Sequence, residues 1–183
     1  MTAVNVSRKD RVGRITLDRP PLNVVDLAMA RDLAAAAARL ESAPDLCAVV
    51  IEARGRAFCA GVEVRDHMPD RGAEMVHEFH RACLSVGAIE TPTVAVVDGA
   101  ALGGGCELTL MCDLVWAGAA ATFGLPEIRL GVFPPLAAVA LPRYVPPHVA
   151  AELILTGRTL TATEAHAVGL VNHVAHENAP LNS

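Results

Sequence analysis

The segment of residues 98–113, DGAALGGGCELTLMCD, constrains the fold of this chain most strongly. An apolar run of strand length ends just before it. The three glycines 103–105 then let the backbone turn sharply, and a helix is expected through about Met111. The first N–H groups of such a helix have no partner inside it, and together with the helix dipole they suit a developing negative oxygen. Glu107 lies three residues beyond Gly104, so its carboxylate is expected to overhang the same opening.

Of two other interpretations of this segment, one stays open and one is excluded. Glu107 could simply compensate the dipole at the start of the helix. A phosphate loop of the Walker type is excluded, because no Lys-Ser/Thr pair follows the glycines.

Around this segment, short apolar runs alternate with helical patterns, which predicts an α/β fold with parallel strand pairing. The run at residues 46–53 is fully apolar up to Glu52, which predicts a strand buried on both faces. Residues 1–175 are expected to form one core, with a polar and disordered tail at 176–183. The predicted strands are residues 4–7, 12–17, 46–53, 93–97, 114–117 and 171–174. The predicted helices are residues 26–42, 71–88, 103–111 and 146–156, the last with Gly157 as its C-cap, and one that begins at the capping box Thr161–Glu164.

Composition narrows the class of protein. Apolar residues make up 52% of the 183 and the net charge is −5, which predicts a folded chain without the basic surplus of a nucleic-acid binder. Three acidic residues (Asp98, Glu107 and Asp113) interrupt the longest apolar run, so no membrane segment is expected. The first ten residues contain no apolar core of a signal peptide. The five cysteines show no metal-binding spacing, and a reducing cytoplasm suits them best.

Two further motifs could contribute to a site. Residues 55–63, GRAFCAGVE, form a small-residue loop after a buried strand and can present a backbone N–H. Residues 123–128, FGLPEI, place Glu127 after a proline. Taken alone, the first is an ordinary turn and Glu127 is a solvated loop residue.

Together the three motifs resemble the crotonase (enoyl-CoA hydratase/isomerase) superfamily. The resemblance covers nearly the whole chain, from LDRP and Leu22-Asn23 through FCAG, ALGGGCEL and FGLPEIRLGVFP to VGLVNHV. It implies a spiral of ββα units with parallel sheets, here without the family's C-terminal helical lid. It also implies an acyl-coenzyme A thioester as substrate, and a homo-oligomer, either a trimer or a hexamer.

The resemblance assigns roles to matching positions. The N–H groups of Ala60 and Gly104 correspond to the oxyanion hole, and Glu107 and Glu127 correspond to the two glutamates of true hydratases. No metal or redox cofactor is implied, since coenzyme A is part of the substrate. Water addition to an α,β-unsaturated acyl-CoA is therefore expected. An isomerase, an acyl-CoA hydrolase or a non-catalytic oligomer partner are the alternatives. The acyl-CoA-binding positions are Val24, Ala60, Gly61, Val62, Glu63 and Gly104.

Two features depart from the family. Residues 131–138, GVFPPLAA, stand where the family has a glycine-rich stretch followed by Thr-Gln-Arg. The GVFPP part of this run and residues 61–67, GVEVRDH, together resemble cyclohexa-1,5-diene-1-carbonyl-CoA hydratases. The chain also stops soon after residue 174, where relatives continue into helices that cover the site. Apolar surface on Leu141, Val145 and Leu153 is therefore expected to be exposed and to promote self-association.

Overall fold

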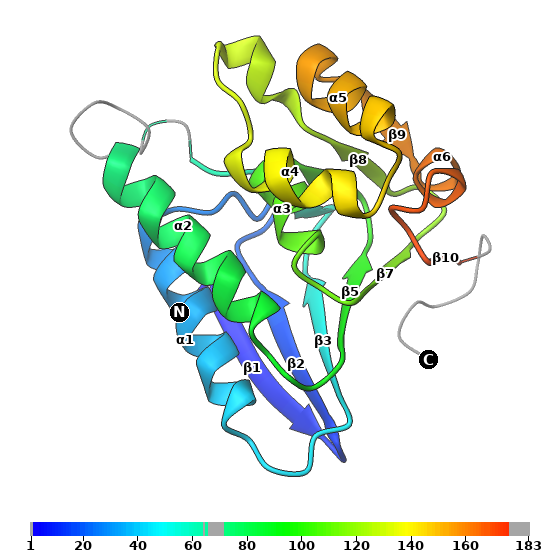
Figure 1. Cartoon of the computed structure of the whole chain (residues 1–183). Helices are drawn as coiled ribbons and strands as arrows, with labels where there is room; N and C mark the ends of the chain where they lie inside the picture. The colour runs from blue at the N-terminus through cyan, green and yellow to red at the C-terminus, as the bar shows by residue number, and fades with distance from the viewer. Residues whose placement is uncertain (1, 64, 66–71, 176–183) are drawn as a thin grey trace.

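The computed structural model describes residues 2–63, 65 and 72–175; the tail predicted at 176–183 lies outside the described residues. A six-stranded sheet forms the lower half of the molecule in Figure 1, in the order β1-β2-β3-β5-β7-β10. Its first pair is antiparallel and every other pair is parallel, as predicted. The strands are β1 (Val4–Lys9), β2 (Val12–Leu17), β3 (Ala48–Ala53), β5 (Thr93–Val97), β7 (Leu114–Ala117) and β10 (His173–Val174).

Two helices, α1 (Leu27–Glu41) and α2 (Gly72–Gly87), pack together on one face of this sheet (Figure 1). Asp26 caps α1 as predicted, because its carboxylate accepts a hydrogen bond from the Met29 N–H at 2.8 Å. The opposite face of the sheet stays partly open. Alternate residues of β3 are only half-buried there, and Trp116 on β7 is 40% exposed. The prediction that β3 is buried on both faces is therefore wrong, since both long helices cover the same side.

The strands of a second, four-stranded sheet were not predicted from the residues, although the resemblance implied more than one sheet. This second sheet contains β4 (Ala57–Cys59), β6 (Ala100–Leu102), β8 (Thr122–Gly124) and β9 (Thr159–Thr161), in that order. Residues 54–61 read as a loop in the sequence because a strand of three residues shows no periodicity. The first turn of the chain, β1-β2-α1, places both strands in the large sheet, and the next two, β3-β4-α2 and β5-β6-α3, each add one strand to each sheet and then a helix. The expected spiral of ββα units is thus confirmed.

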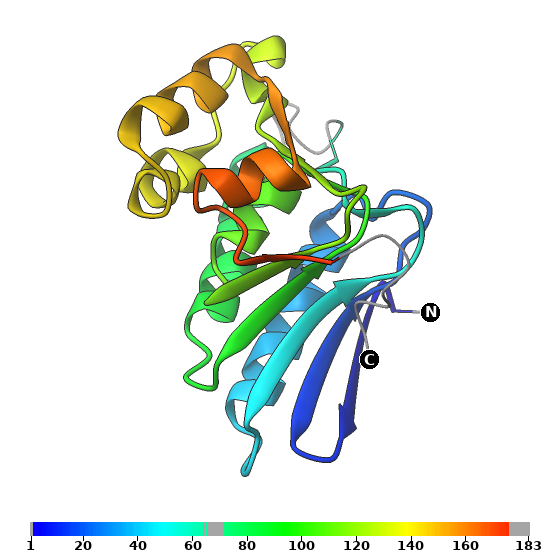
Figure 2. The same ribbon diagram turned by 90° about the vertical axis from the view of Figure 1, so that its right-hand side faces the viewer.

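Beyond one end of the large sheet, the helices α4 (Pro135–Ala140), α5 (Pro147–Thr156) and α6 (Ala162–Ala167) lie together (Figure 2). The 3-10 segment η2 (Pro126–Leu130) precedes α4, and a second one, η3 (Leu141–Arg143), lies between α4 and α5. Gly157 ends α5 with φ +65°, and Thr161 and Glu164 form the predicted capping box of α6. No helix in the described part of the chain is long and apolar enough to cross a membrane.

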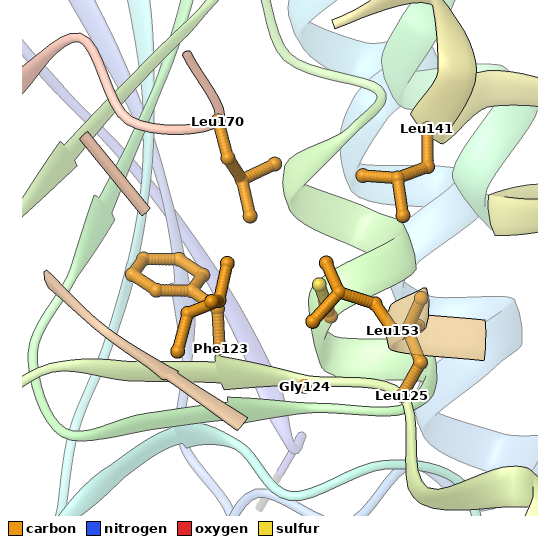
Figure 3. A pocket seen from close by; sticks show the side chains of 8 residues that line it. Phe123, Gly124, Leu125, Leu141, Leu153 and Leu170 are labelled. Carbon is orange, nitrogen blue, oxygen red and sulfur yellow. The ribbon is translucent and has the colours of Figure 1, made fainter. Parts of the chain in front are cut away.

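A closely packed apolar cluster joins this helical group to α3 and β8. Side chains from α3, β8, η3, α5 and β9 converge there, as Figure 3 shows, and leave no room for a water molecule. The expectation that Leu141, Val145 and Leu153 are exposed is wrong, because all three are at most 4% exposed. The exposed apolar side chains described in this region are instead Ile128, Leu130, Val132, Phe133, Val139, Tyr144 and Leu155. The cluster is lined by Cys106, Phe123, Gly124, Leu125, Leu141, Leu153, Leu160 and Leu170.

Candidate active site

The turn between β6 and α3 (Gly104–Thr109) lies at the centre of the site. Gly103 has φ +53° and ψ −124°, a conformation that only glycine adopts without strain. A Cβ on Gly105 would lie 2.1 Å from the Cys59 carbonyl oxygen, so α3 packs directly on the backbone of β4. The predicted helix is therefore present, though it ends at Thr109 rather than Met111. The glycines set both the turn and the close approach of α3 to β4.

Glu107, in the first turn of α3, is only 3% exposed. Its carboxylate oxygen Oε1 accepts a hydrogen bond from the Ala137 N–H, at the start of α4, at 3.0 Å. Burial raises the pKa of Glu107 to about 7; the Ala137 N–H opposes this shift, and the nearby Glu127 carboxylate adds to it. A residue that only compensated the dipole of its own helix would not need this burial or this distant partner.

Glu127, in η2, approaches the same turn from the opposite side. A Cβ on Gly103 would lie 2.7 Å from its Oε1 atom, so the carboxylate rests against the glycine backbone. Its other oxygen, Oε2, is buried and has no hydrogen-bond partner in the described part of the chain. Burial raises the pKa of this carboxyl, and its own backbone N–H opposes the shift. Glu127 is therefore a half-buried group beside Glu107, and the interpretation as a solvated loop residue does not fit.

Two backbone N–H groups complete the site, and one of them differs from the prediction. Among residues 2–63, 65 and 72–175, no acceptor bonds the N–H of Gly104 or of Val62. The predicted donor Ala60 is already engaged, because its N–H donates to the Leu22 carbonyl at 2.9 Å. As a correction, the N–H groups of this loop without an acceptor among the described residues are those of Gly61 and Val62, and Val62 is the one whose side chain packs against Gly104.

Apolar side chains enclose these donors. A Cβ on Gly104 would lie 2.6 Å from Cγ2 of Val62 and 2.8 Å from the ring of Phe79. Phe79 reaches the site from α2 and is 3% exposed. Sequence analysis missed Phe79 and Ala137, because the helical pattern of α2 explains the first as core and nothing marks the second.

The remaining predicted binding positions lie in two adjacent segments. Val24 is half-buried in the segment before α1, and an isolated parallel bridge joins its neighbour Val25 to Val62. Gly61 has φ +113°, and a Cβ there would lie 3.3 Å from the Leu102 carbonyl oxygen. The Glu63 carboxylate accepts a hydrogen bond from the Arg65 N–H. Of these positions, Gly61 and Val62 lie against the turn at Gly103 and Gly104, and contact of the whole set with acyl-CoA stays a prediction.

The cysteines contribute no metal site within the described residues. Cys59, Cys83, Cys106 and Cys112 are buried, and burial raises the pKa of each thiol. Protonated, desolvated thiols are poor nucleophiles and poor metal ligands. They therefore serve as small apolar packing residues.

This arrangement of one buried and one half-buried carboxylate beside a glycine turn, on a ββα spiral, defines the class of protein. The pattern of the family described as enoyl-CoA hydratase/isomerase matches residues 7–182. The chain is 41% identical over 172 residues to the "Probable enoyl-CoA hydratase echA8" of Mycobacterium tuberculosis, covering 92% of this chain and 67% of the relative. It is 37% identical over 164 residues to the cyclohexa-1,5-dienecarbonyl-CoA hydratase of Thauera aromatica, covering 90% and 64%.

Solved structures agree with this assignment. The enoyl-CoA hydratase of Mycobacterium smegmatis superposes with a TM-score of 0.89 at 32% identity, covering 94% of this chain and 70% of that one. DspI of Pseudomonas aeruginosa superposes with a TM-score of 0.93 at 28% identity, covering 97% and 70%. The chain belongs to the enoyl-CoA hydratase/isomerase family, whose fold is that of crotonase. It spans about two thirds of the length of the curated relatives it matches.

Proposed function

We propose that the chain is a hydratase that adds water across the Cα=Cβ bond of an α,β-unsaturated acyl-CoA. The observation that carries this proposal is the convergence of Glu107 and Glu127 on one turn. They come from separate elements, and both have pKa values raised by burial. An acid and a base with pKa values near the working pH are what water addition requires.

In this reaction the oxygen of water bonds to Cβ, and the water loses one proton to a carboxylate. The electron pair of the double bond moves toward the thioester, whose oxygen becomes negative. Cα then takes a proton from the other carboxyl, which gives a 3-hydroxyacyl-CoA. Because the two carboxylates repel each other in a desolvated site, one of them is readily protonated near neutral pH.

The N–H groups of Gly104 and Val62 would receive the thioester oxygen. Both N–H groups have no acceptor among the described residues, and the contacts at Gly104 place the two residues side by side. Two fixed donors stabilise the enolate more than the ground state, because the charge on the oxygen grows along the reaction. Apolar Phe79 and Val62 keep water from the donors, which strengthens this interaction.

Substitution of the two glutamates tests the mechanism. Glu107→Gln and Glu127→Gln should each lower the turnover of crotonyl-CoA by about 10²–10⁴-fold. The double variant should be little slower than either single one, because the pair acts as a unit. A matched control is Glu152→Gln, an exposed residue on α5 paired with Arg158, which should leave turnover unchanged. Wild-type turnover in either site variant would remove the hydratase mechanism.

Product analysis separates the alternatives. The family also contains isomerases, so the test needs chromatography of the products: a hydrated acyl-CoA supports the hydratase, and a shifted double bond supports an isomerase. The resemblance of residues 131–138 to cyclohexadienecarbonyl-CoA hydratases supports a cyclic dienoyl substrate, and the Thauera enzyme, 37% identical, is one such relative. We therefore expect cyclohexa-1,5-diene-1-carbonyl-CoA to be hydrated with a higher kcat/KM than crotonyl-CoA. No turnover of either thioester would favour a non-catalytic oligomer partner.

A further inference from the structure

We propose that Asn23 is a positioning residue for the two N–H donors of the site. Its side chain holds the segment of residues 21–25 against the loop that carries the Val62 N–H. The inference rests on the proposed function, since the donors are those assigned to the thioester oxygen. Asn23 itself does not touch the reacting atoms.

Asn23 is fully buried, and its side chain satisfies three hydrogen bonds. Its Oδ1 accepts from the Arg19 N–H at 2.8 Å. Its Nδ2 donates to the carbonyls of Arg54 and Ala57, at 2.7 and 2.9 Å. The backbone of Asn23 has φ +51°, a left-handed conformation that asparagine tolerates better than most residues. One side chain thus joins three points of the chain and orients the segment around it.

The oriented segment in turn fixes the loop by backbone hydrogen bonds on both sides of Val62. In a trans peptide the C=O and N–H point in opposite directions. Because the Gly61 carbonyl points to Val25, the N–H of Val62 in the same peptide points away from the segment and toward Gly104. The bonds are Arg56 N to Pro21 O (3.2 Å), Ala60 N to Leu22 O (2.9 Å), Val25 N to Gly61 O (2.9 Å) and Glu63 N to Val25 O (2.8 Å).

Loss of the Asn23 side chain should therefore misalign the Val62 N–H relative to that of Gly104. An oxyanion donor acts mainly when charge develops, so misalignment lowers kcat more than it weakens binding. We expect a loss of roughly 10–100-fold in kcat, somewhat less than the 10²–10³-fold expected when a donor is removed. A merely structural role would lower stability and leave the kcat of the folded fraction unchanged.

The test compares Asn23→Asp and Asn23→Gly with a matched control, Asn172→Ala. Aspartate keeps the acceptor for Arg19 and loses both donors, and glycine adopts φ +51° without strain. Asn172 also holds a backbone with its side chain, accepting from the Val115 N–H at 2.8 Å, but it lies between β7 and β10, away from the site. The measurements are kcat and KM, the midpoint of urea unfolding, and the infrared stretch of the thioester carbonyl in bound butyryl-CoA.

We expect both Asn23 variants to lose kcat with KM within threefold of wild type, and to shift the carbonyl stretch less than wild type does. Asn172→Ala should lose stability only. Unchanged kcat and carbonyl stretch in a folded Asn23 variant would overturn the proposal. So would failure of both Asn23 variants to fold while Asn172→Ala folds, which would make the role structural. A wild-type protein that shifts the carbonyl stretch without hydrating any enoyl-CoA would overturn the proposed function and leave this inference intact. A wild-type protein that binds no butyryl-CoA would overturn both the proposed function and the role of Asn23.

Discussion

Gly103→Ala should separate the chemistry of the site from the stability of the fold. The residue has φ +53° and ψ −124°, where a side chain costs about 1–3 kcal/mol of backbone strain. The new Cβ would lie 2.7 Å from Oε1 of Glu127, well inside contact distance. This oxygen is at the end of a flexible side chain, so the carboxylate moves and the backbone need not. The variant should therefore fold, with a displaced Glu127.

The displacement should have two effects on activity. Turnover should fall by about 10²–10⁴-fold, as for loss of an acid–base group. The pKa of Glu107 should also move down toward its ordinary value, because the neighbouring Glu127 is one cause of its increase, while burial, the largest cause, remains. The pH profile of kcat should shift to lower pH accordingly. Steady-state kinetics from pH 5 to 9 and urea unfolding measure both quantities.

The chain provides a control for strain alone. Gly131 also has positive φ, +73°, and a Cβ there would meet nothing within 4 Å. Gly131→Ala should cost about 1 kcal/mol of stability. Although Gly131 lies between Glu127 and Ala137, its Cβ displaces no neighbour, so both carboxylates should keep their positions and kcat should stay unchanged. If Gly103→Ala keeps wild-type kcat while losing stability, Glu127 does not take part in the reaction from the position described.

Three other predictions test separate features. Because the pKa of Glu107 is raised in the folded state, its contribution to stability is full below pH 4.5 and is lost as the pH rises to about 7. Urea unfolding of wild type relative to Glu107→Gln should show a loss of about 3 kcal/mol over this interval, and a flat difference would contradict the burial of the carboxyl. Gly105→Ala should prevent stable folding, because its Cβ would lie 2.1 Å from a backbone oxygen, whereas Gly87→Ala, with 3.6 Å to its nearest atom, should keep the wild-type Tm. Finally, exposed apolar side chains on residues 130–139 should promote self-association to a trimer or hexamer, and light scattering that shows a stable monomer would refute this.

The longer strands and helices could be predicted from the sequence, because each has its own periodic signal. The strand at residues 12–17, the helix capped by Asp26 and the capping box at Thr161 all match the structure. The strands of the second sheet could not be predicted from the residues, because they have three residues each and exist only through pairing with one another. The burial of Leu141 and Leu153 was equally hidden, since it depends on how η3 and α5 pack against β8.

The site was predictable at the level of residues rather than of atoms. Both glutamates and the glycine turn follow from the motif, but the motif does not show which N–H of residues 60–62 is free. That depends on the pairing of Leu22 and Val25 with this loop, a contact between segments more than 30 residues apart in sequence. In the same way, the burial of Glu127 depends on Gly103, which leaves space for its carboxylate.

A single short segment controls both carboxylates. Residues 127–137 begin with Glu127, which rests against Gly103, and end with Ala137, whose N–H binds Glu107. The middle of this segment is exposed: Leu130 is 66% accessible and Phe133 62%. A shift of the segment would move Glu127 and remove the Ala137 donor at once, which would raise the pKa of Glu107 as its partner left. The two glutamates are therefore coupled through the backbone as well as through their charges. This coupling is a physical reason to expect that the effects of Glu107→Gln and Glu127→Gln do not add.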